Sequence, residues 1–137
     1  MKKSWKQKLN INRVPEVEVV EKGFGAITPG TKMLISTPLE TEELVNSIPE
    51  GKVMFSPEIR ATLAAKHGAD TTCPLTTGIF LRIIAEAAWD EHLEGKAIKE
   101  CTPFWRAIDP KSPLAKKLRC GPEFLREMQG AESNSKA

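Results

Sequence analysis

The chain has 137 residues, is 40% hydrophobic and 28% charged, and carries a net charge of +2. This length predicts one domain with a core large enough to fold without disulfides or a metal. No apolar run approaches the roughly 18 residues of a membrane span, and the basic start lacks the apolar stretch of a signal peptide. We therefore expect no membrane partner and a cytoplasmic protein.

The first 39 residues are predicted to be an irregular N-terminal extension with a few short elements. We expect a short helix over residues 4–9 and an edge strand within residues 14–20, where apolar and acidic side chains alternate. Residues 32–35 form a second strand candidate. The glycines and proline between the two strands break regular structure.

Start and stop signals predict two helices after this extension. The first covers about residues 40–47, with Thr37 or Thr41 as its N-cap. The second begins at Ser56, which precedes a proline at the first helical position, and Gly68 supplies its left-handed end. Residues 52–55, between the two helices, are predicted to form a short strand.

The longest predicted helix follows Pro74 and continues to about Leu93. Apolar pairs recur in it at helical spacing, and they are Ile79/Phe80, Ile83/Ile84 and Ala87/Ala88. Together with the helix before it, this segment predicts a helix-turn-helix pair. Residues 102–108 are then predicted to form a strand or extended turn, and residues 114–119 a basic loop.

A last helix is predicted from about residue 120, with Phe124, Leu125 and Met128 on its apolar side. Residues 133–137 are polar and predicted to fray. The predicted fold class is α+β and mainly helical, a winged-helix-like helix-turn-helix domain with a small β-element. Residues 1–39 would be the extension and residues 40–132 the domain.

Three widely spaced cysteines are present, an odd number that fits reduced thiols better than a disulfide framework. They are Cys73, Cys101 and Cys120. The two histidines do not bracket them at zinc-finger spacing. Cys101 has no neighbouring histidine that could activate it, so an ordinary thiol is favoured over a nucleophile. We expect no metal and no cofactor, and a structural role for His67 and His92 near helix ends.

Two runs of basic residues contain no acid. The first comprises Lys2, Lys3, Lys6, Lys8 and Arg13, and the second Lys111, Lys116, Lys117 and Arg119. One interpretation is a solvated tail and a solvated loop, and the other is contact with phosphates. The net charge is too small to identify a nucleic-acid-binding protein by itself.

Residues 104–106 combine two aromatic side chains with an arginine. Because adjacent side chains of a strand face opposite ways, one ring would fill the core and the other would be exposed beside Arg106. An exposed ring there would be a stacking surface for a base. The alternative is that Phe104 and Trp105 are both core residues.

The order of several motifs resembles the C-terminal domain of the alkylguanine-DNA alkyltransferases over residues 40–132. This chain has Ile-Pro-Glu-Gly-Lys-Val at residues 48–53, Ser56-x-x-Ile59, a second helix, and Thr-Pro-Phe-Trp-Arg at residues 102–106. The family has Ile-Pro-x-Gly-Lys-Val, a helix-turn-helix, and Pro-Cys-His-Arg. Cys120-Gly121 falls at the family's Gly-Gly, and Glu132 at its active-site glutamate.

The resemblance implies a protein that does not transfer alkyl groups, because Phe104 stands at the alkyl-accepting cysteine and has no thiolate. Trp105 stands at the family's histidine. The alkyltransferase-like proteins, which carry tryptophan in place of that cysteine and bind damaged DNA without repairing it, are the closer analogue. Here the tryptophan lies one position later. An enzyme that uses Cys101 remains an alternative.

The resemblance further implies a protein that reads double-stranded DNA from the minor groove and extrudes a damaged base. The residues expected to contact DNA are Lys52, Ser56, Thr76, Thr77, Arg82, Lys116 and Lys117. The expected base pocket comprises Pro103, Phe104, Trp105, Arg106 and Glu132. Thr77 and Ser56 replace an arginine and a tyrosine of the family. The other hypothesis is therefore a protein-interaction or small-molecule-binding module that has lost DNA binding.

Overall fold

The computed structural model describes residues 3–135 and has an α+β, mainly helical fold, as the sequence predicts. Lys2, and the last two residues of the predicted frayed tail, lie outside the described residues. The elements in chain order are α1 (Trp5–Leu9), β1 (Glu16–Val19), β2 (Lys32–Ile35), α2 (Pro38–Asn46), α3 (Ser56–Lys66), β3 (Thr71–Thr72), α4 (Pro74–Leu93), η1 (Ile98–Glu100), η2 (Phe104–Arg106), α5 (Pro113–Lys117) and α6 (Gly121–Ser135).

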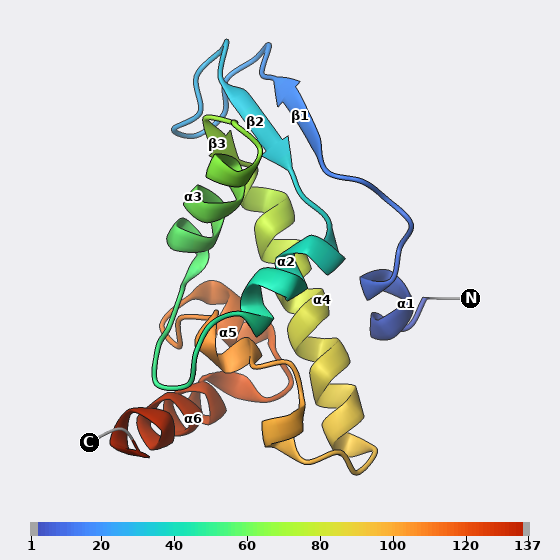
Figure 1. The fold of residues 1–137 in the computed structure, drawn as a ribbon, viewed down its shortest axis with the longest axis vertical. Helices are drawn as coiled ribbons and strands as arrows, with labels where there is room; N and C mark the ends of the chain where they lie inside the picture. The colour runs from blue at the N-terminus through green and yellow to red at the C-terminus, as the bar shows by residue number, and fades with distance from the viewer. Residues whose placement is uncertain (1–2, 136–137) are drawn as a thin grey trace.

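Helix α4 is the centre of the fold, and α1, α2, α3 and the 3₁₀ turn η2 all contact it (Figure 1). Its middle, residues 81–88, is buried on nearly every side, with Leu81, Ile83, Ile84 and three alanines in the core. A helix that is apolar around its circumference must be covered on several sides. This explains why the shorter helices surround it. No helix among residues 3–135 is long and apolar enough to cross a membrane.

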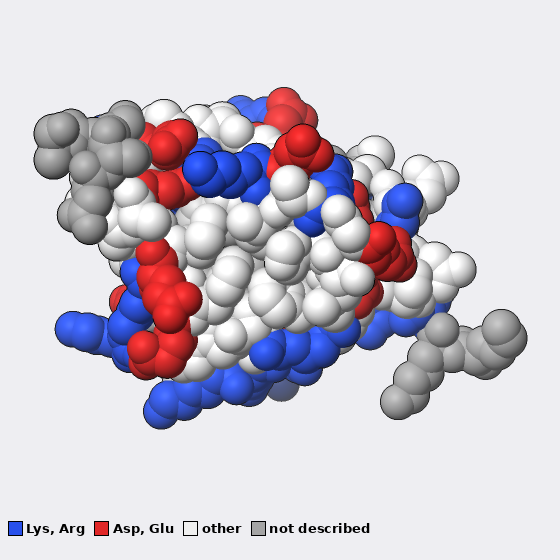
Figure 2. Space-filling model, turned by 90° about the horizontal axis from the view of Figure 1, so that it is seen from below, with Lys and Arg blue, Asp and Glu red and all other residues white. Residues whose placement is uncertain are grey.

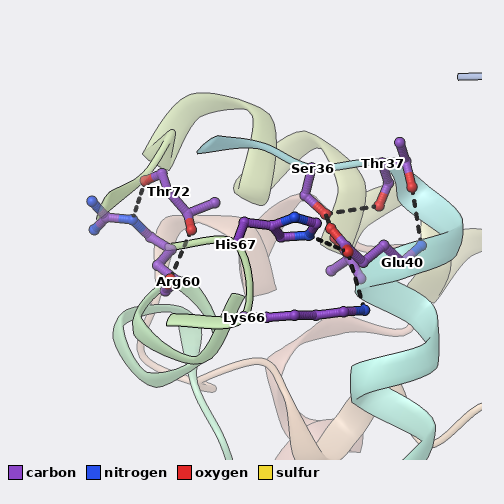
Figure 3. Close-up of polar contacts among 8 residues, drawn as sticks. Ser36, Thr37, Glu40, Arg60, Lys66, His67 and Thr72 are labelled. Atoms are coloured by element: carbon purple, nitrogen blue, oxygen red, sulfur yellow. Dashed lines mark hydrogen bonds and ion pairs between the residues drawn. The ribbon is translucent and has the colours of Figure 1, made fainter. Parts of the chain in front are cut away.

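The small sheet joins the N-terminal extension to the helical domain. Strand β1 pairs antiparallel with β2, and β2 pairs parallel with β3, so β1 is the edge strand that the sequence predicts. Strand β3 lies in the turn between α3 and α4. Arg60 of α3 fixes this turn, because its Nε donates to the Thr72 carbonyl at 2.9 Å and the Thr72 hydroxyl donates to the Arg60 carbonyl at 2.7 Å (Figure 3).

Helices α3 and α4 agree with the predicted pair and have an arrangement compatible with a helix-turn-helix. The predicted bounds of α4 are confirmed, and Thr37 is the N-cap of α2. The N-cap of α3 is Phe55, so Ser56 is the first helical residue and makes no capping hydrogen bond. In a winged helix the β-hairpin, or wing, follows the second helix of the pair. Here β1 and β2 both come before α2, so the small sheet is not a wing of that kind.

Three predicted segments are wrong. Residues 52–55 form no strand, since Met54 donates its backbone N–H to the Arg106 carbonyl at 2.8 Å but no ladder of such bonds develops. The predicted basic loop contains the helix α5, whose start repeats the hydroxyl-then-proline signal: the Ser112 hydroxyl caps it and Pro113 is its first residue. Helix α6 continues to Ser135, beyond the predicted point of fraying.

Gly68 and Gly78 differ in backbone conformation, so substituting each with alanine tests the turn after α3 and the helical interior of α4. Gly68 has a φ of +64° after α3, whereas Gly78 lies inside α4, where an added Cβ would meet no atom within 4 Å. We expect Gly68→Ala to lower the free energy of unfolding by about 1 kcal/mol, because alanine is strained in the left-handed region. Gly78→Ala should raise it by about 1 kcal/mol through helix propensity.

Urea denaturation followed by circular dichroism measures both changes. Equal effects of the two substitutions would contradict the assignment of Gly68 to a left-handed turn and of Gly78 to a helix interior.

Candidate functional site

Of the strand or extended turn predicted for residues 102–108, no strand forms, and the two aromatics lie in a 3₁₀ turn. Arg106 donates its backbone N–H to the Pro103 carbonyl, and Ala107 donates to the Phe104 carbonyl, each at 3.0 Å. In such a turn successive side chains diverge by about 120° instead of alternating. Phe104 and Trp105 can therefore both enter the core while Arg106 points toward the surface.

Both aromatic side chains are core residues, each only 1% exposed. Their rings meet edge to face with centroids 5.4 Å apart, and Phe104 also stacks on Phe124 of α6. The expectation that one ring is an exposed stacking surface is therefore wrong. It rested on the alternation of a strand that does not form.

Arg106 makes the strongest polar contacts of this region. Its Nε and Nη2 donate to the two carboxylate oxygens of Glu132 at 2.9 and 2.7 Å, and its Nη1 donates to the Ile48 carbonyl at 2.8 Å. Gln129, one turn earlier on α6, donates to the backbone carbonyls of Trp105 and Ile108. Helix α6 thus holds the 3₁₀ turn at several points.

The electrostatics of Glu132 follow from these contacts. Partial burial alone would raise the pKa of this carboxyl, but hydrogen bonds from Arg106 and Trp105 and the positive charge of Arg106 lower it. Glu132 is therefore ionised at neutral pH and paired. The sequence resemblance placed both residues in one expected pocket but did not predict that they pair.

A hollow of about 200 Å³ opens beside this ion pair, and we call it the Arg106 hollow. Its lining residues are Glu50, Ile98, Lys99, Trp105, Arg106, Met128, Ala131 and Glu132. Three of the five residues expected to form a base pocket are brought together here. Pro103 and Phe104 are buried and do not line it.

A second hollow, of about 250 Å³, lies on the other side of the 3₁₀ turn, and we call it the α4 hollow. It is bordered by the start of α3, by one face of α4 and by the chain leading into α5. Its lining residues are Phe55, Ser56, Pro57, Gly78, Leu81, Ala107, Ile108, Asp109, Ser112, Pro113 and Leu114. Ser56 is the only residue of the expected DNA-contact set that lines it, and the lining is mostly apolar.

The residues expected to contact DNA from α4 are not all available for contact. Thr77 is buried, and its hydroxyl donates to the Cys73 carbonyl at 2.7 Å. Arg82 is half-buried, with its guanidinium 5.4 Å from the centre of the Trp5 ring. Thr76 and Ser56 are half-exposed, and Lys52, Lys116 and Lys117 are exposed.

Besides Leu93 at its C-terminal end, the exposed side chains of α4 are instead Leu75 and Ile79, at 68% and 56%. Sequence reasoning missed them because Ile79 was assigned to the apolar core face through its pairing with Phe80. The spacing Leu75, Ile79 and Arg82, at i, i+4 and i+7, marks a separate stripe along one face of the helix. This stripe was the signal that could have revealed them.

Charge is unevenly distributed on the face shown in Figure 2. Its centre is uncharged, Lys and Arg side chains gather along one edge, and Asp and Glu side chains form groups at its sides. A polyanion would contact such a face at its basic edge and not across its middle.

A polar cluster centred on Glu40 connects α2 to the end of α3 (Figure 3). The Ser36 hydroxyl donates to one carboxylate oxygen at 2.5 Å, while His67 Nε2 and Lys66 Nζ lie 2.6 and 3.2 Å from the other. Burial alone would raise the pKa of Glu40, but these hydrogen bonds lower it. Ser36 contacts the carboxylate and not the imidazole, so the cluster contains no serine activated by a histidine.

None of the three cysteines has the surroundings of an activated thiol. Cys73 and Cys101 are buried and Cys120 is half-buried. Burial is the main cause that raises the pKa of Cys101, and burial together with the charge of Glu86 raises the pKa of Cys120 to about 11. Among residues 3–135, no three metal-ligating side chains converge on one point.

No protein-family model, curated protein or solved structure matches this chain. The candidate sites therefore rest on the geometry above and on the motif resemblance.

The Arg106–Glu132 pair predicts a dependence of stability on pH. The pKa of Glu132 is lowered in the folded state, so its stabilisation is complete above the unfolded value near 4.5 and is lost as pH falls through the folded value. Glu132→Gln should cost about 2 kcal/mol at pH 7 because it leaves Arg106 without its charged partner. It should also flatten the acid limb of the stability profile.

The matched control is Glu127→Gln, an exposed glutamate on the same helix. Urea unfolding from pH 3 to 7 measures both variants. If the two substitutions change the profile equally, Glu132 has no special role in stability.

The raised thiol pKa values predict slow alkylation. At pH 7 iodoacetamide should label the native protein more slowly than a model thiol, since the thiolate is the nucleophile. For Cys120, the rate should rise about tenfold per pH unit until the pH approaches the pKa of about 11. Mass spectrometry of labelled peptides measures each site. Fast labelling of Cys101 at pH 7 would revive the hypothesis of an enzyme that uses this residue.

Proposed function

We propose that this chain is an alkyltransferase-like protein that binds double-stranded DNA and does not transfer alkyl groups. The observation that carries the proposal is the pairing of an exposed apolar stripe on α4 with the α4 hollow beside it. Helix-turn-helix proteins contact DNA through the second helix of the pair. Leu75 and Ile79 would face the duplex in this arrangement.

The chemistry of the stripe suits the minor groove. Proteins that bind this groove often insert apolar side chains between base steps and unstack them. The family's arginine is replaced by the buried Thr77, and the exposed Ile79 is two residues further along the same helix. Ile79 would occupy the space left by an unstacked base, and the mostly apolar α4 hollow would receive that base.

The absence of transfer activity in this proposal follows from chemistry at one position. Phe104 stands where the resemblance has the accepting thiol, and it is buried against Phe124. Cys101 is no substitute, because its thiol lies 3.5 Å from the Ala97 carbonyl in the protein interior. Arg106 and Glu132, the retained residues, would then preserve the shape of the turn and not perform a reaction.

The first test is a salt titration of binding to a duplex, with and without an O6-alkylguanine. Phosphate contacts release counterions, so the logarithm of the association constant should fall linearly with the logarithm of the salt concentration. Tighter binding of the alkylated duplex is expected. Absence of binding at micromolar protein in low salt would overturn the proposal. It would favour the alternative, a protein-interaction or small-molecule module that uses the Arg106 hollow.

The second test fills the α4 hollow. Gly78→Leu adds a side chain that borders this hollow, and Gly130→Leu adds the same side chain on α6, where an added Cβ also meets nothing within 4 Å. We expect Gly78→Leu to reduce the ratio of affinities for the alkylated and the unmodified duplex by roughly tenfold. This factor corresponds to the loss of one base-stacking contact of about 1.4 kcal/mol. Gly130→Leu should leave the preference unchanged. Equal behaviour of the two variants would show that the α4 hollow receives no base.

A further inference from the structure

We infer that the N-terminal helix α1 is a second phosphate-binding element, docked beside the α4 stripe so that both contact the same DNA duplex. This inference rests on the proposed function and deepens it by assigning a role to a segment that the family resemblance does not cover.

Helix α1 is held against α4 by specific contacts. Trp5 packs on the main core, Leu9 is buried in it, and Ser4 closes the start of the helix with a reciprocal capping box to Gln7. Because this short helix is capped and docked, the backbone positions from which its exposed side chains project are fixed. A merely solvated tail would need none of these contacts.

The docking places α1 at the end of the exposed stripe. Arg82 follows Leu75 by seven residues, which is close to two helical turns, so the two side chains lie on nearly the same line along α4. The Trp5 ring lies 5.4 Å from the Arg82 guanidinium and 4.5 Å from Lys8 Nζ. Arg82 Nε is buried and has no hydrogen-bond partner among the described residues. The stripe therefore continues from α4 onto α1.

The charges along this path are all positive. No acidic residue occurs before Glu16, and none occurs in α4 before Glu86. Lys3, Lys6 and Arg13 are exposed. The acidic residues of α4 are confined to its second half, where Glu86 and Asp90 pair with Arg119. The first half of α4 and the whole of α1 thus carry basic side chains and no acidic ones, which fits a polyanion.

The experiment compares three variants of the full chain in the salt titration with unmodified duplex. The double variant Lys3→Gln/Lys6→Gln removes two exposed charges, one just before α1 and one within it, and leaves the packed residues Trp5 and Leu9 unchanged. Trp5→Ala removes the docking contact and no charge. Lys22→Gln with Lys32→Gln removes two exposed charges from the sheet region as the matched control. Urea unfolding checks that each variant is folded.

The α1 double variant should flatten the salt slope by about 2, since each lost phosphate contact contributes about 0.9. Trp5→Ala should flatten it as well, although its charge is unchanged. The control should keep the wild-type slope. The inference is overturned if both double variants have equal slopes, or if the folded Trp5→Ala variant binds as the wild type does. If the wild type still binds the duplex, either of these results overturns only the role of α1 and leaves the proposed function intact. If the wild type does not bind, the role of α1 and the proposed function are both overturned.

Discussion

The contact on which the rest of the structure depends is the paired hydrogen bonding of Arg106 to Glu132, with a third bond to the Ile48 carbonyl. These bonds join three segments that are far apart in the sequence: the end of α2, the 3₁₀ turn and α6. A guanidinium presents its donors in a rigid fork, so it can fix the positions of a carboxylate and a carbonyl simultaneously. Both side chains are largely withdrawn from water, and loss of either would leave a charge with poor solvation.

This clamp explains how two large aromatic side chains are buried in a tight turn. Phe104 and Trp105 fill space between α4 and α6, while Arg106 passes the Trp105 ring at 5.7 Å and holds α6 through Glu132. A second polar connection acts further along α4, where Arg119 reaches the buried carboxylate of Glu86 and also Asp90. Arg106 thus connects α6 to the 3₁₀ turn and to the segment after α2, whereas Arg119 connects the start of α6 to the central helix.

The structure changes which residues the proposed DNA contact involves. The 3₁₀ turn keeps both of its aromatic side chains in the interior, so it supports the fold. The accessible features lie on either side of it: the Arg106 hollow next to the ion pair, and the α4 hollow next to Leu75 and Ile79. The N-terminal extension is part of the same body, because β2 pairs with β3 and α1 docks on α4.

The sequence by itself determined the elements whose signals are local. Hydrophobic periodicity fixed α4, the proline after Ser56 marked the start of α3, and the alternation of valine and glutamate identified the edge strand β1. The motif order placed Arg106 and Glu132, 26 residues apart, in one expected pocket, and the structure shows that they form an ion pair. Only the tertiary structure decided the direction of individual side chains, because that depends on neighbours distant in sequence. A 3₁₀ turn buries both Phe104 and Trp105, and the elements packed around α4 leave Leu75, Ile79 and Leu93 as its exposed large apolar residues.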